Sequence, residues 1–494
     1  MSVTKFPAGR LALACSSVAA LMYGGSAFAT GCMGAGAPAT GYLECYTAVQ
    51  IPADPNNGAT ASNGGIRSFD ISWVDATRGL YFLGDRSNFG IDIIDLNANP
   101  PKFVGRAGGF VGILPAGAKT VAANNNISGP DGVTSHGRWL YAGDGNSTLK
   151  VFDTIDPANP KLVATISTGG TTRVDEMSLT TDGTMILVAN NAEDPPFSTL
   201  MHANGDSAVN TMSAASIITQ IKADPTIIPA GNGLSMEQPT WDASEARYYN
   251  SIPQIANNPA GCDFAGAGGK PICQGGLAVI DPTTLAAGHA TLGAYSAATN
   301  AGIISLADCG PNGATVGPNN SVGLACTPQN VATNTTTQVF NTKTLNFVEV
   351  GHITGGDEIW YNSGDRKYYV GASRACGKAS GCPTGGAVLG VINADTNMYI
   401  EGIAASSNSH SVAADSKHNY VLVPEVGSTV DVGAGGETET ATLTTTTDVC
   451  GGTKGCVVVY RHRAHGDNDS DRGDDDRGDR GDHGGHGGHE GHDR

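Results

Sequence analysis

The feature that most constrains this chain is a short unit that recurs along it. In each copy a polar residue leads into an apolar strand, a turn follows, and a second strand comes shortly after. Two copies open almost identically, with GPDGVT from Gly129 and GPNGAT from Gly310. A recurring unit of this kind builds a repeat architecture, because one copy cannot bury its apolar face alone.

Seven copies can be placed, and successive openings lie about 45 to 75 residues apart, with up to four strands after each opening. Propeller blades have this length and strand content, and loop insertions account for the longer intervals. The sequence therefore predicts an all-β fold, a seven-bladed β-propeller. Six blades is the alternative, if residues 237–358 form one blade with a large insertion. The polar residues that open the seven units are Asp70, Asp131, Glu176, Glu237, Asn312, Glu358 and His410.

The two ends of the repeat region predict how the ring closes. The last unit has three strands before the chain becomes highly polar, and the segment ECYTAVQIP, residues 44–52, precedes the first unit without a partner. Closing a propeller leaves no open sheet edge. We therefore expect residues 44–52 to form the outer strand of the last blade, within a propeller domain over residues 30–463. The third unit lacks a clear third strand, and SAASIITQI, residues 213–221, is the best candidate.

The N-terminus and the cysteines indicate an exported protein. Residues 1–29 have the basic start, apolar stretch and Ala-Phe-Ala ending of a signal peptide. No later segment is apolar for long enough to predict a membrane span. Of the eleven cysteines, those after Cys15 fall into close pairs, which predicts local disulfides in a periplasmic, secreted or cell-surface protein. The predicted pairs are Cys32–Cys45, Cys262–Cys273, Cys309–Cys326, Cys376–Cys382 and Cys450–Cys456.

Charge and motifs restrict the function. The formal net charge of −18 disfavours nucleic acid as a partner and favours divalent cations or basic surfaces. The chain has no Cys-x-x-Cys-His motif for haem attachment, no Gly-x-Ser-x-Gly nucleophile motif and no His-Glu-x-x-His zinc motif. Covalent haem and the best-known hydrolase motifs are therefore unsupported.

The seven opening residues are candidates for a site. In a propeller the start of each innermost strand faces the central channel, so these side chains are predicted to converge at one mouth. Carboxylate and amide oxygens suit Ca²⁺. A bound Ca²⁺ would polarise a lactone or ester carbonyl while His410 acted as general base, with Glu358 as the second candidate catalytic residue. In the alternative interpretation the seven side chains are structural and accept hydrogen bonds from neighbouring blades.

The C-terminal segment, residues 464–494, is too rich in Gly, Asp and His to build an apolar core, and we expect it to be disordered. Histidines recur at every third position between glycines, a pattern that favours chelation of Zn²⁺, Ni²⁺ or Cu²⁺. The alternative is a solubilising tail without a ligand. The predicted tail ligands are His483, His486, His489 and His492.

Three pieces of the chain resemble the YVTN-type secreted β-propellers: TTDGTMILVANN, STLKVFDTIDPANPKLVATISTGG and GLAVIDPTTL. The resemblance implies a propeller fold and export. It does not select one function, because the family includes binding proteins, surface proteins, lactonase-like enzymes and the haem domain of nitrite reductases. The sequence favours an exported binding protein that presents its channel or loop face to a protein or small-molecule ligand and carries a metal-binding tail. The alternative is a Ca²⁺-dependent hydrolase.

Overall fold

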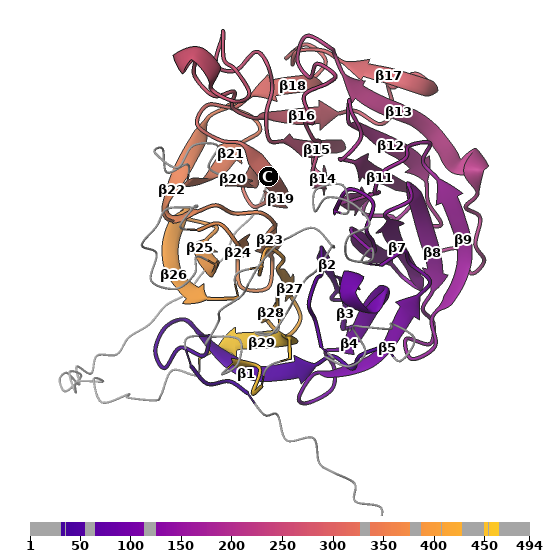
Figure 1. The fold of residues 1–494 in the computed structure, drawn as a ribbon, viewed down its shortest axis with the longest axis vertical. Helices are drawn as coiled ribbons and strands as arrows, with labels where there is room; N and C mark the ends of the chain where they lie inside the picture. Colours follow the sequence, from indigo (N-terminus) through magenta and orange to yellow (C-terminus); the bar gives the residue numbers. More distant parts are fainter. Residues whose placement is uncertain are drawn as a thin grey trace, which may run out of the picture.

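The computed structural model of the protein describes residues 31–34, 36–54, 65–112, 125–326, 336–375, 387–406, 408–426, 449–452 and 454–463. Over these residues the chain forms seven β-sheets arranged in a ring (Figure 1). Residues 237–358 contribute two separate sheets, so the prediction of seven blades is confirmed and the six-blade alternative is wrong. Within these ranges no helix is long and apolar enough to cross a membrane.

Six blades are formed by strands that follow one another along the chain, from the innermost strand to the outermost. Each blade has four strands in the order of a meander, with neighbouring strands of the meander antiparallel, as in blade 1. Blade 1 contains β2 Ser72–Asp75, β3 Leu80–Asp85, β4 Gly90–Asp95 and β5 Lys102–Gly108. Blade 2 contains β6 Val133–His136, β7 Trp139–Asp144, β8 Thr148–Asp153 and β9 Lys161–Ser167.

The remaining meanders have the same layout. Blade 3 contains β10 Met177–Leu179, β11 Met185–Asn190, β12 Phe197–His202 and β13 Ile217–Ala223. Blade 4 contains β14 Pro239–Asp242, β15 Arg247–Ile252, β16 Gly276–Ile280 and β18 Gly302–Ser305. Blade 5 contains β19 Pro311–Gly317, β20 Ser321–Cys326, β21 Thr336–Asn341 and β22 Phe347–Thr354. Blade 6 contains β23 Ile359–Asn362, β24 Lys367–Ala372, β25 Val388–Asn393 and β26 Met398–Ala404.

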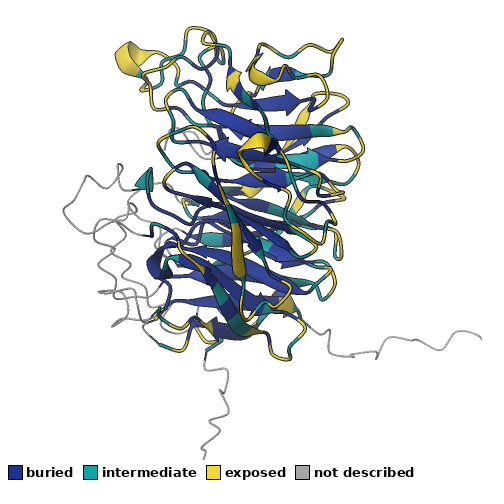
Figure 2. Cartoon of the chain, turned by 90° about the vertical axis from the view of Figure 1, so that its right-hand side faces the viewer, coloured by how far each residue is buried: buried dark blue, intermediate teal, exposed yellow. Residues whose placement is uncertain are grey.

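The hydrophobic core lies between neighbouring blades. Strands β3 and β7 are buried along their whole length, whereas the outermost strand β9 is exposed at most positions (Figure 2). Apolar side chains from both faces of each inner sheet pack against the next blade, as Phe82 of blade 1 packs with Leu140 of blade 2 in one cluster. Since one blade alone would expose both of its faces, the ring as a whole provides the core.

Blade 7 joins the two ends of the chain. It contains β27 Ala413–Asp415, β28 Tyr420–Glu425, β29 Cys456–His462 and, as its outer strand, β1 Leu43–Gln50. Strand β1 pairs antiparallel with β29 from Leu43 opposite His462 to Gln50 opposite Cys456. The predicted closure by the N-terminal segment is confirmed.

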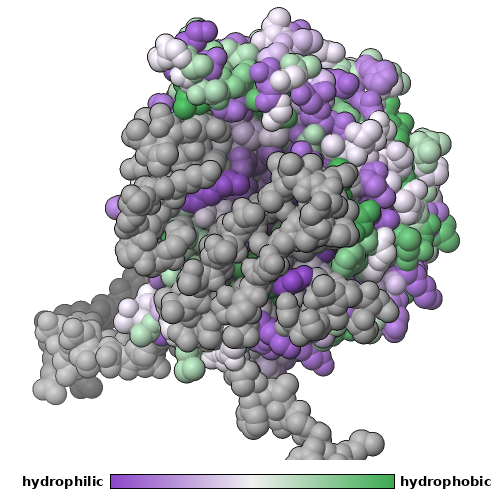
Figure 3. Space-filling view, in the orientation of Figure 1, coloured by the Kyte–Doolittle hydropathy of each residue, from purple (hydrophilic) through white to green (hydrophobic). Residues whose placement is uncertain are grey.

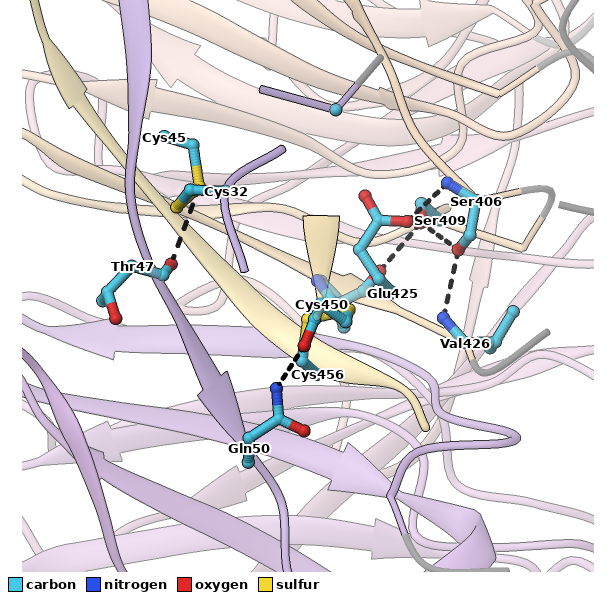
Figure 4. Close-up of a disulfide and its surroundings, with 12 residues drawn as sticks. Cys32, Cys45, Thr47, Gln50, Ser406, Ser409, Glu425, Val426, Cys450 and Cys456 are labelled. Atoms are coloured by element: carbon cyan, nitrogen blue, oxygen red, sulfur yellow. Dashed lines mark hydrogen bonds between the residues drawn. A yellow bond between two sulfur atoms is a disulfide. The ribbon is translucent and has the colours of Figure 1, made fainter. Parts of the chain in front are cut away.

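Two disulfides flank this closing pair of strands (Figure 4). Cys32–Cys45 ties the segment before β1 to the strand, and Cys450–Cys456 ties the start of β29 to the residues before it. The Gln50 side-chain amide donates to the carbonyl of Cys450 at 2.7 Å. The predicted pairs Cys262–Cys273 and Cys309–Cys326 are also present, while Cys376 and Cys382 lie outside the described residues.

Blade 3 differs from the prediction. Its third strand is β12, Phe197–His202, and residues 217–223 form the fourth strand β13, so the assignment of 213–221 as third strand is wrong. A fifth strand, β17 Gly288–Leu292, comes from the β16–β18 connection of blade 4 and pairs in parallel with β13. The predicted signal peptide and tail, residues 1–29 and 464–494, lie outside the described residues.

Candidate functional site

The opening residues of the seven units lie at the inner edge of the blades, directly before an innermost strand or, for Asn312, inside one. Figure 3 shows hydrophilic side chains near the centre of one face of the ring. Five of the seven line a single polar cavity of about 110 Å³, which we call the polar compartment. Glu358 instead lines the adjoining cavity, and Asp131 lines neither. The five are Asp70, Glu176, Glu237, Asn312 and His410.

Asp131 is part of a buried ion pair. Arg86, in the short 3₁₀ helix η2 Arg86–Asn88, donates from Nε to Asp131 Oδ1 at 2.9 Å and pairs through Nη2 with Asp70. All three side chains are almost completely buried. Burial opposes ionisation of Asp70, but Arg86 and His410 outweigh it and hold the pKa of this carboxyl well below its usual range. Arg86 therefore connects the openings of blades 1 and 2.

A second arginine, Arg173, forms an ion pair at the opening of blade 3. Arg173 pairs with Asp175, with 2.9 Å between Nη2 and Oδ2, and donates to the Asn191 side chain at 3.0 Å. Its Nη1 also lies 4.0 Å from Asp70 Oδ2. Asn191 in turn donates to Glu237 at 2.9 Å. The acids of the polar compartment are thus held by guanidinium and amide groups of the chain itself.

Sequence reasoning missed both arginines. Each stands beside a blade opening or a strand end, where a charged residue next to buried strands is a detectable signal. In the described part of the chain, no group of three or more His, Cys, Asp and Glu side chains is arranged to hold a metal ion. A Ca²⁺ ion among Asp70, Asp131, Glu176, Glu237, Asn312, Glu358 and His410 stays a prediction.

His410 lies between two oxygen acceptors. Its Nδ1 is 2.9 Å from the carbonyl oxygen of Asn408, and its Nε2 is 3.1 Å from Asp70 Oδ1. Its ring also stacks on Phe69, with 4.8 Å between centroids. A carbonyl and an ionised carboxylate can only accept, so this arrangement favours a hydrogen on each ring nitrogen. A histidine held in this way is poorly placed to act as a general base.

The adjoining cavity, about 350 Å³, has a different lining. Three of the four tryptophans of the chain face it from the innermost strands of three blades: Trp73 of β2, Trp241 of β14 and Trp360 of β23, beside Tyr361. We call this cavity the aromatic compartment. The rings of Trp73 and Trp360 meet edge to face at 4.9 Å, although blade 7 lies between their blades. The small side chains of β27, Ala413 and Ala414, leave room for this contact.

Four buried polar atoms on the lining of the aromatic compartment have no hydrogen-bond partner among the described residues. They are Trp73 Nε1, Ser135 Oγ, Glu176 Oε2 and Glu358 Oε1. The other oxygen of Glu358 accepts from the Ser411 hydroxyl and from the backbone N–H of Val412. Buried polar groups in folded proteins are nearly always paired, so a ligand that supplied partners to these four atoms would remove an unfavourable contribution; further such atoms lie elsewhere in the described residues.

Burial also controls the charge of the two glutamates. It raises the pKa of Glu358 to about 8, against which the hydrogen bonds from Ser411 and Val412 act. It raises the pKa of Glu176 well above its usual range, with further contributions from Asp175 and Glu237. In both side chains burial therefore favours the protonated carboxyl over the carboxylate.

The sequence contained a signal for the aromatic compartment. Three of the innermost strands read SWVD, PTWD and IWYN, each with a tryptophan at the second or third position. An aromatic side chain at one place in repeated units that face a common axis predicts a shared lining. The sequence analysis used only the polar residues that open the units.

No protein-family model matches the chain, and no curated protein matches it. Among solved structures, the chain is similar to one from the "Crystal Structure of Mitotic Checkpoint Complex", with 9% sequence identity and a TM-score of 0.45 over 86% of this chain and 94% of that chain. A similarity this weak carries no inference about function. The seven-bladed fold rests on the ring of sheets itself, and membership of the YVTN-type family is not confirmed.

Proposed function

We propose that the protein is an exported binding protein that takes a small ligand in its central channel. One observation carries this proposal: three tryptophans from three blades line one cavity, together with four residues that each hold an unpaired buried polar atom. Ligand sites combine apolar and aromatic walls with a few convergent polar groups, and a cavity of about 350 Å³ is within the usual size range. Four disulfides among the described residues are consistent with an extracellular location.

The calcium-dependent hydrolase has less support. Its mechanism needs a histidine with a nitrogen free to accept a proton, whereas both ring nitrogens of His410 lie within hydrogen-bond distance of acceptor oxygens, those of Asn408 and Asp70. It also needs carboxylates available to a cation, whereas Asp70 and Asp131 share Arg86. The metal-binding role of His483, His486, His489 and His492 rests on the sequence pattern alone.

A screen with a blocked channel tests the proposal. Thr181 is exposed and lines the mouth of the aromatic compartment, so Thr181→Trp fills the entrance without disturbing the core. Thr165→Trp, on the exposed outer strand β9, is the matched control. We expect at least one compound of a metabolite library to raise the melting temperature of the wild type and of Thr165→Trp, but not of Thr181→Trp. Equal responses in all three proteins would place binding outside the channel.

A further inference from the structure

The walls of the aromatic compartment favour a flat, partly apolar ligand. Trp73, Trp241 and Trp360 approach from blades 1, 4 and 6, and each is only partly buried, so part of each indole remains accessible from the cavity. Trp241 also packs against Tyr248 at 4.7 Å, which fixes its ring. Rigid aromatic faces bind ligands through stacking at a low entropic cost.

The polar groups on the same lining favour hydroxyl groups on the ligand. Trp73 Nε1 is a donor, Ser135 Oγ both donates and accepts, and Glu176 and Glu358 each have one carboxyl oxygen without a partner among the described residues. Further serine and threonine residues, such as Thr180 and Thr240, complete the wall. A ligand with several hydroxyls matches this mixture of donors and acceptors.

Charge excludes other small ligands. None of the described lining residues is lysine or arginine, and the one histidine among them, His136, already lies against Asp206, so the lining offers an anion little attraction. An organic cation stacks on tryptophan, but it gains most beside an ionised carboxylate. Since burial raises the pKa of Glu176 and Glu358, it favours the neutral form of both groups. A neutral ligand requires no change in their protonation.

From these observations we propose that the aromatic compartment binds a neutral carbohydrate, with a sugar ring stacked on Trp241 or on the Trp73–Trp360 pair and its hydroxyls bonded to polar side chains of the lining, among them Ser135, Glu176 and Glu358. This inference rests on the proposed binding function and names the class of ligand. The Glu358 carboxyl acts as a hydrogen-bonding group, so an amide in its place can serve the same ligand.

Binding measurements on the full chain test the inference. The probes are an array of neutral glycans, followed by calorimetry with glucose, galactose, mannose, N-acetylglucosamine and the disaccharides that the array selects. Choline and tetramethylammonium are the comparison ligands. The variants are Trp241→Ala, Glu358→Gln and, as an aromatic truncation on the outer strand β22, Phe347→Ala.

We expect at least one sugar to bind, with affinity reduced at least about tenfold in Trp241→Ala, unchanged in Phe347→Ala and within about threefold in Glu358→Gln. A sugar whose affinity is the same in Trp241→Ala binds elsewhere, and the inference is then wrong. Binding of choline, lost in both Trp241→Ala and Glu358→Gln, would replace the carbohydrate by a cation and leave the proposed function intact. If no sugar binds, while Thr181→Trp abolishes the binding of a library compound, the carbohydrate inference is wrong and the proposed binding function stands. Failure of all ligands would overturn both proposals.

Discussion

The two compartments of the channel adjoin and share Glu176, but only the polar compartment is lined by arginines, although Asp175 Oδ1 there also has no hydrogen-bond partner among the described residues. In the polar compartment Asp70 is paired with Arg86 and His410, and Asp175 with Arg173. In the aromatic compartment Trp73 Nε1 and Ser135 Oγ have no partner among the described residues.

The difference separates a structural role from a binding role. Side chains that neutralise one another hold neighbouring blades in register and offer little to a ligand. A polar atom left unpaired in a buried wall destabilises the folded state unless a ligand or a water molecule hydrogen-bonds to it. The acidic residues that open the units, which are the clearest feature of the sequence, thus have a structural role. The innermost strands that carry tryptophan form the candidate site.

Opening the ring should have the largest effect, because it should disrupt both compartments, each of which depends on blade 7 being in place. The Asp70–His410 pair joins blade 1 to blade 7, and Trp73 contacts Trp360 across that blade. We expect deletion of residues 30–52, which removes β1, to abolish cooperative unfolding in calorimetry. Deletion of residues 464–494 is the control and should leave the transition unchanged. A protein without 30–52 that melts like the full chain would contradict closure by β1.

Removing one guanidinium should damage the polar compartment alone. Arg86→Met leaves Asp70 and Asp131 buried without their shared cation, and we expect a loss of about 3–5 kcal/mol in the free energy of unfolding at pH 7. The loss should shrink toward pH 4, because the buried carboxyls of the variant, without their cation, take up protons as the pH falls. Chemical denaturation measures it, with Arg366→Met, an exposed pair with Asp395, as control. Equal, small losses in the two variants would show that the buried pair is not structural.

The proton on Glu358 links the comparison to pH. In the folded protein this carboxyl has a pKa of about 8, against an ordinary value of 4.5, so between these pH values the folded state binds one proton more than the unfolded state. Stability from this group is complete below pH 4.5 and is lost as pH rises toward 8, by up to about 1.4 kcal/mol per pH unit.

Glu358→Gln has no such proton, and its side-chain oxygen can still accept from Ser411 and Val412. We therefore expect its stability to fall less than that of the wild type between pH 5 and pH 8, by a difference on the order of a few kcal/mol. Thermal denaturation at several pH values gives the comparison, with exposed Glu349→Gln as control. Parallel curves for the wild type and Glu358→Gln would show that Glu358 is ionised when folded.

The smallest expected effect concerns calcium. Since Arg86 and Arg173 already compensate the acids of the polar compartment, we expect chelation followed by added Ca²⁺ to shift the melting temperature of the full chain by less than about one degree. The tail histidines prefer softer metals than Ca²⁺ and should not obscure the result. A clear rise with Ca²⁺ would restore the cation predicted among the seven opening residues.

The sequence predicted the frame of this molecule well, because each blade repeats the same local rules. Apolar strands, glycine turns and a polar opening residue are all short-range features of the sequence. Residues 44–52 could be assigned to the last blade because they had no partner before the first unit and that blade lacked an outer strand. Blade 3 was misassigned because its third strand, FSTLMH, follows a Pro-rich turn and alternates weakly, while IITQIKA looks stronger.

The candidate site was harder to predict, because it depends on contacts between distant residues. Nothing local states that Arg86 lies between Asp70 and Asp131, or that Trp73 meets Trp360 from another blade. Which buried atom has a partner is likewise decided only by tertiary packing. The sequence predicted which residues lie near the axis of the ring. The structure shows which of their polar atoms already have a partner within the chain.

The pairing of β1 with β29 also has a consequence for the order of folding. Strand β1 is made first, but its partner is among the last residues of the propeller to be synthesised. Until then both edges of β1 have unsatisfied backbone groups, which invite pairing with another chain. The Cys32–Cys45 bridge involves only early residues and can form during this wait, shortening the exposed segment before its partner arrives. Premature chain termination anywhere before β29 would therefore release a protein in which β1 has no strand to pair with.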